Sequence, residues 1–279
     1  MSTAGRAHPP LSFAMSILLS SVPLLERAGQ AIDSGYRQLE SWWPWSESEP
    51  SAREIASFAA TVVDRGARLY LLNLTEGPPE YGGRGLAGVP AQESAFWSNS
   101  GAALELGGLA GTRYLNVLAG NIQSEGAQAG LAVLEERLVA LADRAADSGI
   151  GLLLEQLNPH DHPDYLLVDP QVTLEVLARV RRRTRGRVGM LADVYHLARS
   201  GVDPVAFIAE HHAAIGHVQL ADYPGRGRPG SGRLPIAGVL ETLRRNDYEG
   251  LIGLEYLPGG EDVPAPEEFW RYLNERKAS

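Results

Sequence analysis

Four short apolar segments each deliver one oxygen-bearing side chain at or near their carboxyl end. They are Gly151–Glu155, Val188–Asp193, Ile215–Gln219 and Leu251–Glu255. Short apolar runs of this kind are typical of strands buried on both faces in a parallel sheet. A carboxylate at the buried end of a strand is costly unless it is paired or binds a cation. Repetition of this pattern in four segments therefore predicts a shared site.

Three carboxylates and one amide oxygen suit Mg²⁺ or Mn²⁺. Without a cation the carboxylates of Glu155, Asp193 and Glu255 would repel, and at least one would take up a proton. A bound cation would polarise a substrate carbonyl and make the neighbouring C–H more acidic. Glu155 and Glu255, three strands apart, could then transfer a proton through an enediolate. The alternative is a set of unrelated strand-end acids that simply reach water.

The elements that would position these side chains alternate regularly between strand and helix. Strands are expected at 12–19, 36–41, 68–74, 113–118, 151–155, 188–193, 215–219 and 251–255, and helices at 22–34, 52–64, 91–106, 125–148, 170–183, 204–212, 236–245 and 266–277. Strict alternation indicates parallel strands joined by crossover helices. Eight such units predict a single-domain α/β fold, a (β/α)₈ TIM barrel, rather than an open sheet. Its active site lies at the carboxyl ends of the strands.

Composition restricts the class of protein. The chain has 279 residues, a net charge of -9 and no cysteine. This excludes thiolate metal sites and disfavours a nucleic-acid partner, which normally needs a basic face. No apolar run approaches the roughly 20 residues of a membrane span. We expect a cytoplasmic protein in which residues 1–10 form a flexible leader and residues 11–279 form the barrel.

A glycine- and arginine-rich loop, 224–232, follows the strand that carries Gln219. Barrels often bind phosphate at this place, but the loop lacks the pattern of a nucleotide P-loop. Arg226, Arg228 and Arg233 could hold a carboxylate or a phosphate, and Arg226 is the strongest candidate. The alternative is a mobile basic loop without a ligand.

Polar and aromatic side chains near the other strand ends are candidates for substrate contacts. Glu40 could bind a substrate hydroxyl, and Trp42, with Trp43 and Trp45, could wall the pocket, cover the barrel rim or form a subunit contact. His196 follows Asp193 by three residues and is either a substrate contact or a satisfied core histidine. His217 should point the same way as Gln219, because side chains two residues apart share a face of a strand.

Beyond these patterns the chain resembles the hydroxypyruvate isomerase family, within the xylose isomerase-like TIM barrels. The resemblance spans nearly the whole chain after the leader and rests on a set of segments in a fixed order: 23–27, 35–36, Asn73 with 84–87, 158–163, Asp193-Val-Tyr-His196, His217-Val-Gln-Leu-Ala-Asp222, 224–230 and Gly253-Leu-Glu-Tyr-Leu-Pro258. It implies a metal held by Glu155, Asp193, Gln219 and Glu255. It also implies that Glu155 and Glu255 act as acid and base, and that His196 and Arg226 contact the substrate. Related sugar epimerases carry a histidine in place of Gln219, which favours the isomerase branch.

The chain departs from the family pattern outside these residues. Gln156 stands where proline is expected, Met15 stands near an expected asparagine, and Arg228 and Arg233 stand where acidic residues are expected. These changes leave the exact substrate open. The leading hypothesis is a metal-dependent isomerase of a small hydroxy-carbonyl acid, of the hydroxypyruvate to tartronate semialdehyde type. The alternatives are a sugar or 2-oxo-tetronate isomerase or 3-epimerase, an endonuclease-like barrel, and a non-catalytic sugar-binding barrel. A homo-oligomer is a further expectation.

Overall fold

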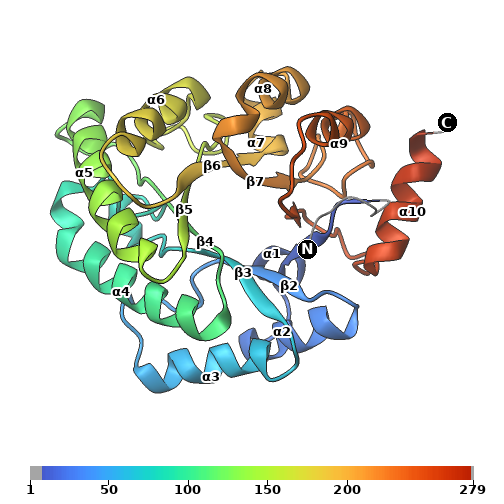
Figure 1. Cartoon of the computed structure of the whole chain (residues 1–279), viewed down its shortest axis with the longest axis horizontal. Coiled ribbons are helices and arrows are strands. Elements are labelled where there is room, and N and C mark those ends of the chain that lie inside the picture. Colours follow the sequence, from blue (N-terminus) through green and yellow to red (C-terminus); the bar gives the residue numbers. More distant parts are fainter. Residues whose placement is uncertain (1–7, 278–279) are drawn as a thin grey trace.

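The protein, seen in a computed structural model that describes residues 8–277, is a closed barrel of eight parallel strands (Figure 1). The strands pair in chain order, and β1 pairs with β8 to close the ring. This confirms the predicted (β/α)₈ fold. The strands are β1 (Leu11–Ala14), β2 (Gln38–Ser41), β3 (Arg68–Asn73), β4 (Tyr114–Val117), β5 (Gly151–Glu155), β6 (Val188–Asp193), β7 (Ile215–Leu220) and β8 (Ile252–Leu254).

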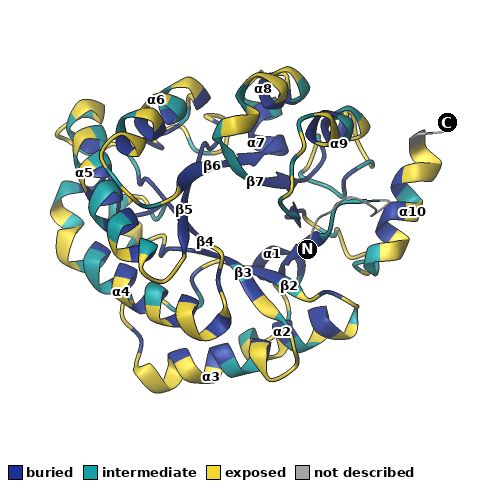
Figure 2. Cartoon of the chain, viewed as in Figure 1, coloured by how far each residue is buried: buried dark blue, intermediate teal, exposed yellow. Residues whose placement is uncertain are grey.

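Helices surround the barrel, and their buried faces point towards the strands (Figure 2). They are α1 (Met15–Leu18), α2 (Leu24–Asp33), α3 (Ala52–Val63), α4 (Glu93–Ala110), α5 (Ala127–Ala146), α6 (Pro170–Arg181), α7 (Val194–Arg199), α8 (Pro204–His211), α9 (Ile236–Arg245) and α10 (Pro266–Lys277). Side-chain caps fix several helix starts. Ser51 and Glu54 form a capping box on α3, and Asp169 and Asp203 cap α6 and α8.

The barrel interior contains an apolar layer beneath a polar one. Leu71, Leu153 and Leu191 form a separate buried cluster. Two residues after each leucine, the same strand carries a polar side chain: Asn73 after Leu71, Glu155 after Leu153 and Asp193 after Leu191. Because residues two apart on a strand point the same way, the leucines lie below the polar groups inside the barrel. The polar layer is therefore supported by packed hydrocarbon at the carboxyl ends of the strands.

Two local predictions about the strand ends were wrong. Residues 12–19 were predicted as one strand, but β1 ends at Ala14 and α1 follows at once. All residues from Leu11 to Leu18 are buried, so the apolar run does not distinguish a strand from a buried helix. The short helix α7 was not expected. It begins directly after β6, where the Asp193 side chain accepts hydrogen bonds from the backbone N–H groups of Tyr195 and His196.

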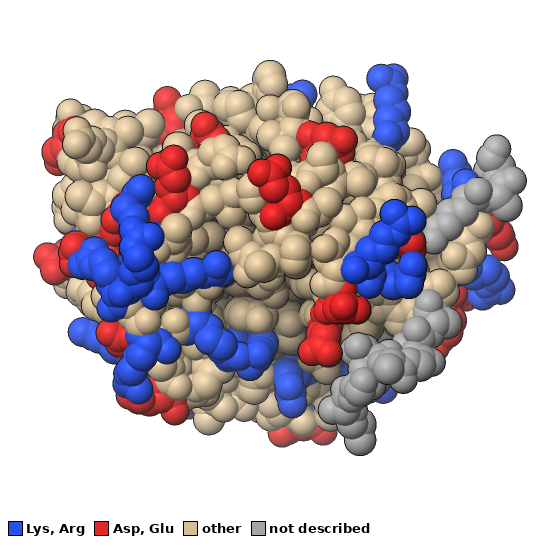
Figure 3. All heavy atoms as spheres, turned by 45° about the horizontal axis from the view of Figure 1, so that its top comes forward, with Lys and Arg blue, Asp and Glu red and all other residues tan. Residues whose placement is uncertain are grey.

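The predicted leader stays a prediction, because residues 1–7 lie outside the described residues. Within residues 8–277, none of the helices has the length and apolar character that crossing a membrane requires. Acidic and basic side chains are interspersed on the face shown in Figure 3. Several arginines are paired with acids of neighbouring helices, among them Arg179 with Glu135 and Arg183 with Glu136.

Candidate active site

Three carboxylates from β5, β6 and the end of β8 meet at the guanidinium of Arg226. The side chains of Glu155, Asp193 and Glu255 are all buried. Arg226 Nη2 lies 2.5 Å from Glu255 Oε2 and 3.0 Å from Asp193 Oδ2. The guanidinium therefore supplies positive charge where the acids converge. The sequence placed Arg226 in this region but did not indicate that it pairs with the predicted metal ligands.

Each of the three carboxylates has one oxygen held by a donor of the protein. Asn116 Nδ2 donates to Glu155 Oε2 at 2.8 Å, and Trp42 Nε1 donates to Glu255 Oε1 at 2.9 Å. Asp193 Oδ1 accepts from the backbone N–H groups at the start of α7. The other oxygens, Asp193 Oδ2 and Glu255 Oε2, face Arg226. These donors hold both oxygens of Asp193 and of Glu255, and one oxygen of Glu155.

Burial and mutual repulsion shift the protonation of these acids. Burial is the largest cause for all three. It raises the pKa of Glu155 well above its usual value, and the charges of Glu255 and Asp193 raise it further. Burial also raises the pKa of Asp193, against the opposing charge of Arg226. The pKa of Glu255 is raised to about 7. Without a further cation the cluster therefore holds protons near neutral pH, as expected for close carboxylates.

Gln219 completes the predicted ligand set from β7. Its Nε2 donates to Glu40 Oε2 at 2.7 Å. Its Oε1 is buried and has no hydrogen-bond partner among the described residues. A buried amide oxygen without a partner is costly unless a ligand satisfies it. Together with the three carboxylates, this oxygen makes a hard-oxygen donor set whose chemistry fits Mg²⁺ or Mn²⁺. Glu155, Asp193, Gln219 and Glu255 would hold the ion.

His196 is buried beside this set, and its nitrogen and the carboxylate oxygens of Glu155 and Asp193 lie within 4.8 Å of one another. However, His196 Nδ1 accepts the backbone N–H of Asn158 at 3.1 Å. Burial, followed by the charge of Arg226, lowers the pKa of His196 well below its usual value. The ring is therefore neutral with its hydrogen on Nε2. A protonated nitrogen donates a hydrogen bond and does not coordinate a metal, which favours a substrate contact.

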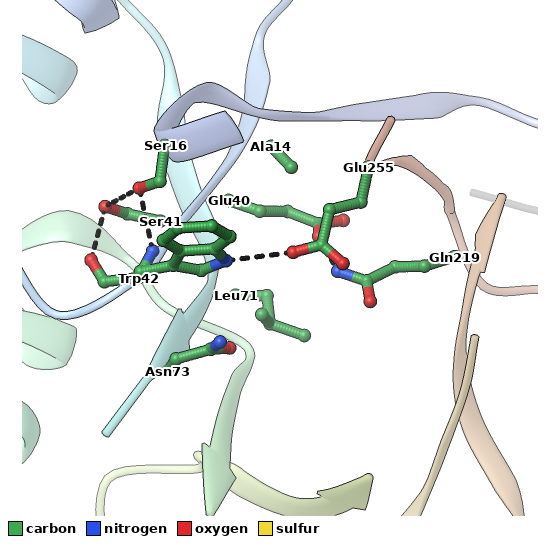
Figure 4. Close-up of a pocket in the computed structure, with 9 residues that line it drawn as sticks. All are labelled: Ala14, Ser16, Glu40, Ser41, Trp42, Leu71, Asn73, Gln219 and Glu255. Atoms are coloured by element: carbon green, nitrogen blue, oxygen red, sulfur yellow. Dashed lines mark hydrogen bonds between the residues drawn. The ribbon is translucent and has the colours of Figure 1, made fainter. Parts of the chain in front are cut away.

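A small pocket opens beside the carboxylates, and Trp42, Glu255, Gln219 and Glu40 face it in Figure 4. Trp42 is 38% exposed and walls this pocket. The two other tryptophans of the loop are not among the residues that line this pocket. Trp43 packs edge-on against Trp45, and Trp45 packs against Phe58 of α3. Arg228 is also directed away from the acids, because its guanidinium lies 3.8 Å from the ring centre of Tyr272.

Glu40 is almost fully buried, and its carboxylate is already hydrogen-bonded within the protein. Its carboxylate is 1% exposed and already bonds Ser12, His217 and Gln219. Although burial alone would raise its pKa, the charge and hydrogen bond of His217 and the hydrogen bonds of Ser12 and Gln219 lower it. His217 and Gln219 both reach Glu40, which confirms that they point the same way. The predicted contact between Glu40 and a substrate hydroxyl remains a prediction.

Several residues at the site were missed. Asn116 is a polar residue inside the apolar strand β4, and that pattern could have revealed it. Asn158, known only as part of a turn, holds His196. His162, which the sequence analysis did not single out, has its ring centre 5.8 Å from that of His196 and accepts from Arg84 Nε at 3.2 Å. Burial, with the charge of Arg84, lowers the pKa of His162 to about 4.

Known proteins agree with this fold. Residues 29–273 match the model of the family described as xylose isomerase-like TIM barrel. A Streptomyces coelicolor protein named "Putative hydroxypyruvate isomerase" is 38% identical over 95% of this chain and 96% of its own length. A 2-oxo-tetronate isomerase of Cupriavidus necator is 29% identical over 90% of this chain and 93% of its own length.

A solved structure shares the fold. The crystal structure titled AP endonuclease, family 2, from Brucella melitensis superposes with a TM-score of 0.84 at 26% identity, covering 95% of this chain and 99% of that one. The hydroxypyruvate isomerase of Escherichia coli is also 26% identical, over 88% of this chain and 92% of its own length. The chain therefore belongs to the hydroxypyruvate isomerase family of the xylose isomerase-like TIM barrels.

Proposed function

We propose that this protein is a Mg²⁺- or Mn²⁺-dependent isomerase that interconverts hydroxypyruvate and tartronate semialdehyde. The observation that carries the proposal is the convergence of three buried carboxylates, one of which, Glu255, lines a pocket together with Gln219, whose Oε1 has no partner among the described residues. The names of the relatives support isomerisation of a small hydroxy-carbonyl acid. A cation held by this set would polarise the substrate carbonyl and make the adjacent C–H more acidic.

Glu155 and Glu255 are the proposed acid and base. They lie on β5 and at the end of β8, so they approach a bound substrate from different sides of the barrel. A base works best when its pKa lies near the working pH, and the pKa of Glu255 is raised to about 7. One glutamate removes the proton from the carbon that bears the hydroxyl. The other delivers a proton to the neighbouring carbon of the enediolate, and the proton of the substrate hydroxyl moves to the former carbonyl oxygen.

His196 and Arg226 are the proposed substrate contacts. His196 Nε2–H is 3.8 Å from Asp193 Oδ2 and is free to donate to a substrate oxygen beside the cation site. Arg226 Nε is buried and has no partner among the described residues, so the guanidinium retains a donor for the carboxylate of the substrate. Trp42 would close the pocket on the solvent side. Glu40 is a weaker candidate for direct contact because its oxygens already accept three hydrogen bonds.

A longer substrate is the second candidate. One relative is named 2-oxo-tetronate isomerase, and two of the four residues that depart from the family pattern, Arg228 and Arg233, lie in or directly after the loop that follows β7. A change at the rim alters the space for the end of the substrate that does not react. The reaction would remain an isomerisation, with an acid one carbon longer, or it would be a 3-epimerisation of a sugar.

The test is a comparison of kcat/KM on hydroxypyruvate, 2-oxo-tetronate and a neutral ketohexose, with Mg²⁺, with Mn²⁺ and after chelation. We expect the highest value on hydroxypyruvate and no turnover after chelation. A preference for the four-carbon acid would select the second candidate. Turnover that survives complete removal of the cation would refute the proposal. A cytoplasmic location and a homo-oligomer stay predictions.

A further inference from the structure

The carboxylate of Glu40 is the centre of a buried hydrogen-bond network at the base of the pocket. Ser12 Oγ donates to Glu40 Oε1 at 2.5 Å, and His217 Nε2 lies 2.7 Å from the same oxygen. Gln219 Nε2 donates to Glu40 Oε2 at 2.7 Å. These four side chains come from β1, β2 and β7. All four are at most 3% exposed, so water does not compete for these bonds.

The hydrogen bond to Glu40 determines which end of the Gln219 amide faces the pocket. The two ends of a side-chain amide have nearly the same shape, but one accepts hydrogen bonds and the other donates them. A carboxylate only accepts, so Glu40 must bind the Nε2 end. The Oε1 end is then directed elsewhere, where it has no partner among the described residues. Only the oxygen can bind a hard cation.

The backbone of β8 prevents the network from rearranging. A Cβ atom added at Gly253 would lie 2.6 Å from Glu40 Oε1, 2.7 Å from Gln219 Cγ and 2.9 Å from His217 Nε2. These distances are shorter than normal contacts between non-bonded atoms. Glycine therefore allows β8 to pack directly against the three side chains. Glu40 and Gln219 are thus held in one arrangement before any ligand arrives.

We propose that Glu40, held by Ser12 and His217, is a positioning residue that turns the Gln219 amide so that its oxygen becomes a cation ligand. This inference rests on the proposed cation site and deepens it. It gives Glu40 a role that needs no contact with the substrate. It also explains why the amide nitrogen is satisfied in the structure while the amide oxygen is not.

The test is a double-mutant cycle on Mn²⁺ affinity, measured by calorimetry on the cation-free full chain without substrate. The variants are Glu40→Leu, Gln219→Leu and the double substitution. Loss of a residue that orients a metal ligand typically weakens metal binding by about 10- to 100-fold. We expect Glu40→Leu to weaken Mn²⁺ binding at least about tenfold when Gln219 is present. In the Gln219→Leu background it should change the affinity by less than about twofold.

Near-ultraviolet circular dichroism would reveal whether Glu40→Leu keeps the fold. A second pair of variants tests the inference if it does not. Ser12→Ala removes one donor to Glu40 and should weaken Mn²⁺ binding several-fold only in the presence of Gln219. Ser100→Ala is the matched control, because Ser100 is a buried serine of α4 and is not among the residues that line this pocket. It should leave the affinity unchanged.

The outcomes separate this inference from the proposed function. Equal losses in the two backgrounds would show that Glu40 acts through general packing and would overturn the inference, with the cation site intact. A wild-type chain that binds no Mn²⁺ would overturn the cation site and the inference together. A loss confined to the background that retains Gln219 would support both.

Discussion

Arg226 neutralises the carboxylates in the absence of a cation, which leads to a prediction about stability. Its Nη2 contacts both Asp193 and Glu255, and its side chain is 19% exposed. Arg226→Met keeps the length of the side chain and removes the charge. Three buried acids would then be left without a positive partner. They would take up protons or repel, and either outcome destabilises the folded state.

The expected loss can be estimated from the burial of this group. Removing one partner of a buried ion pair costs about 3–5 kcal/mol. The lower end, about 3 kcal/mol, applies here because the carboxylates can take up protons in place of remaining charged. At about 2–4 °C per kcal/mol for a domain of this size, the midpoint of thermal unfolding should fall by on the order of 10 °C.

The assay is differential scanning calorimetry of cation-free wild type and Arg226→Met, repeated in saturating Mn²⁺. The cation supplies the charge that the variant lacks, so the difference in Tm should narrow in Mn²⁺. Arg228→Met is the control from the same loop, because Arg228 lies over Tyr272 and bonds none of the three acids. It should behave as wild type. Equal Tm values for wild type and Arg226→Met without Mn²⁺ would refute this reasoning. A difference in Tm between the two proteins that stays the same in Mn²⁺ would refute it as well.

The other predictions concern protons, catalysis and the role of His196. The pKa of Glu255, raised to about 7 mainly by burial, means that a proton competes with the cation below that pH. Mn²⁺ affinity in calorimetric titrations should therefore fall at least about tenfold per pH unit below about 7; a constant affinity from pH 6 to 8 would contradict this. Glu155→Gln and Glu255→Gln should each lower kcat on the acid by about 100-fold or more, the usual contribution of a positioned acid or base. Unchanged turnover in either variant would remove that residue from the proposed acid–base pair. His196→Asn should raise KM or lower kcat for the substrate. It should leave the Mn²⁺ affinity within about twofold, because a ring with its hydrogen on Nε2 donates a hydrogen bond and does not bind a metal. A loss of Mn²⁺ affinity of about tenfold would identify His196 as a metal ligand.

The strand-end positions could be predicted because they follow from local patterns. Glu155 and Asp193 are the last residues of β5 and β6, and Glu255 directly follows β8. Each ends an apolar run whose length suits a buried strand. Once the alternation of elements indicated a barrel, the carboxyl ends had to share one face. Chemistry at that face then followed from residue type alone.

The contacts of Arg226 and Gln219 could not be predicted in the same way. Arg226 lies in an irregular loop and adopts a left-handed φ of 54°, which no periodic pattern indicates for a residue with a side chain. The orientation of the Gln219 amide depends on Glu40, which is 179 residues away in the sequence. Likewise, α1 replaced the end of the predicted first strand because buried apolar residues fit either structure. Long-range contacts of this kind exist only in the folded chain.

The most direct measurement is proton NMR of hydroxypyruvate in D₂O with the purified protein, with and without trace Mn²⁺. Removal of the C3 proton by a glutamate and return of a solvent deuteron predict loss of the C3–H signal together with an aldehyde product. We expect both changes with Mn²⁺ and neither after chelation, and we expect Glu155→Gln to be inactive. An aldehyde product that forms after chelation or with Glu155→Gln would contradict metal-assisted proton transfer by Glu155, as would an intact C3–H signal in the Mn²⁺-loaded wild type.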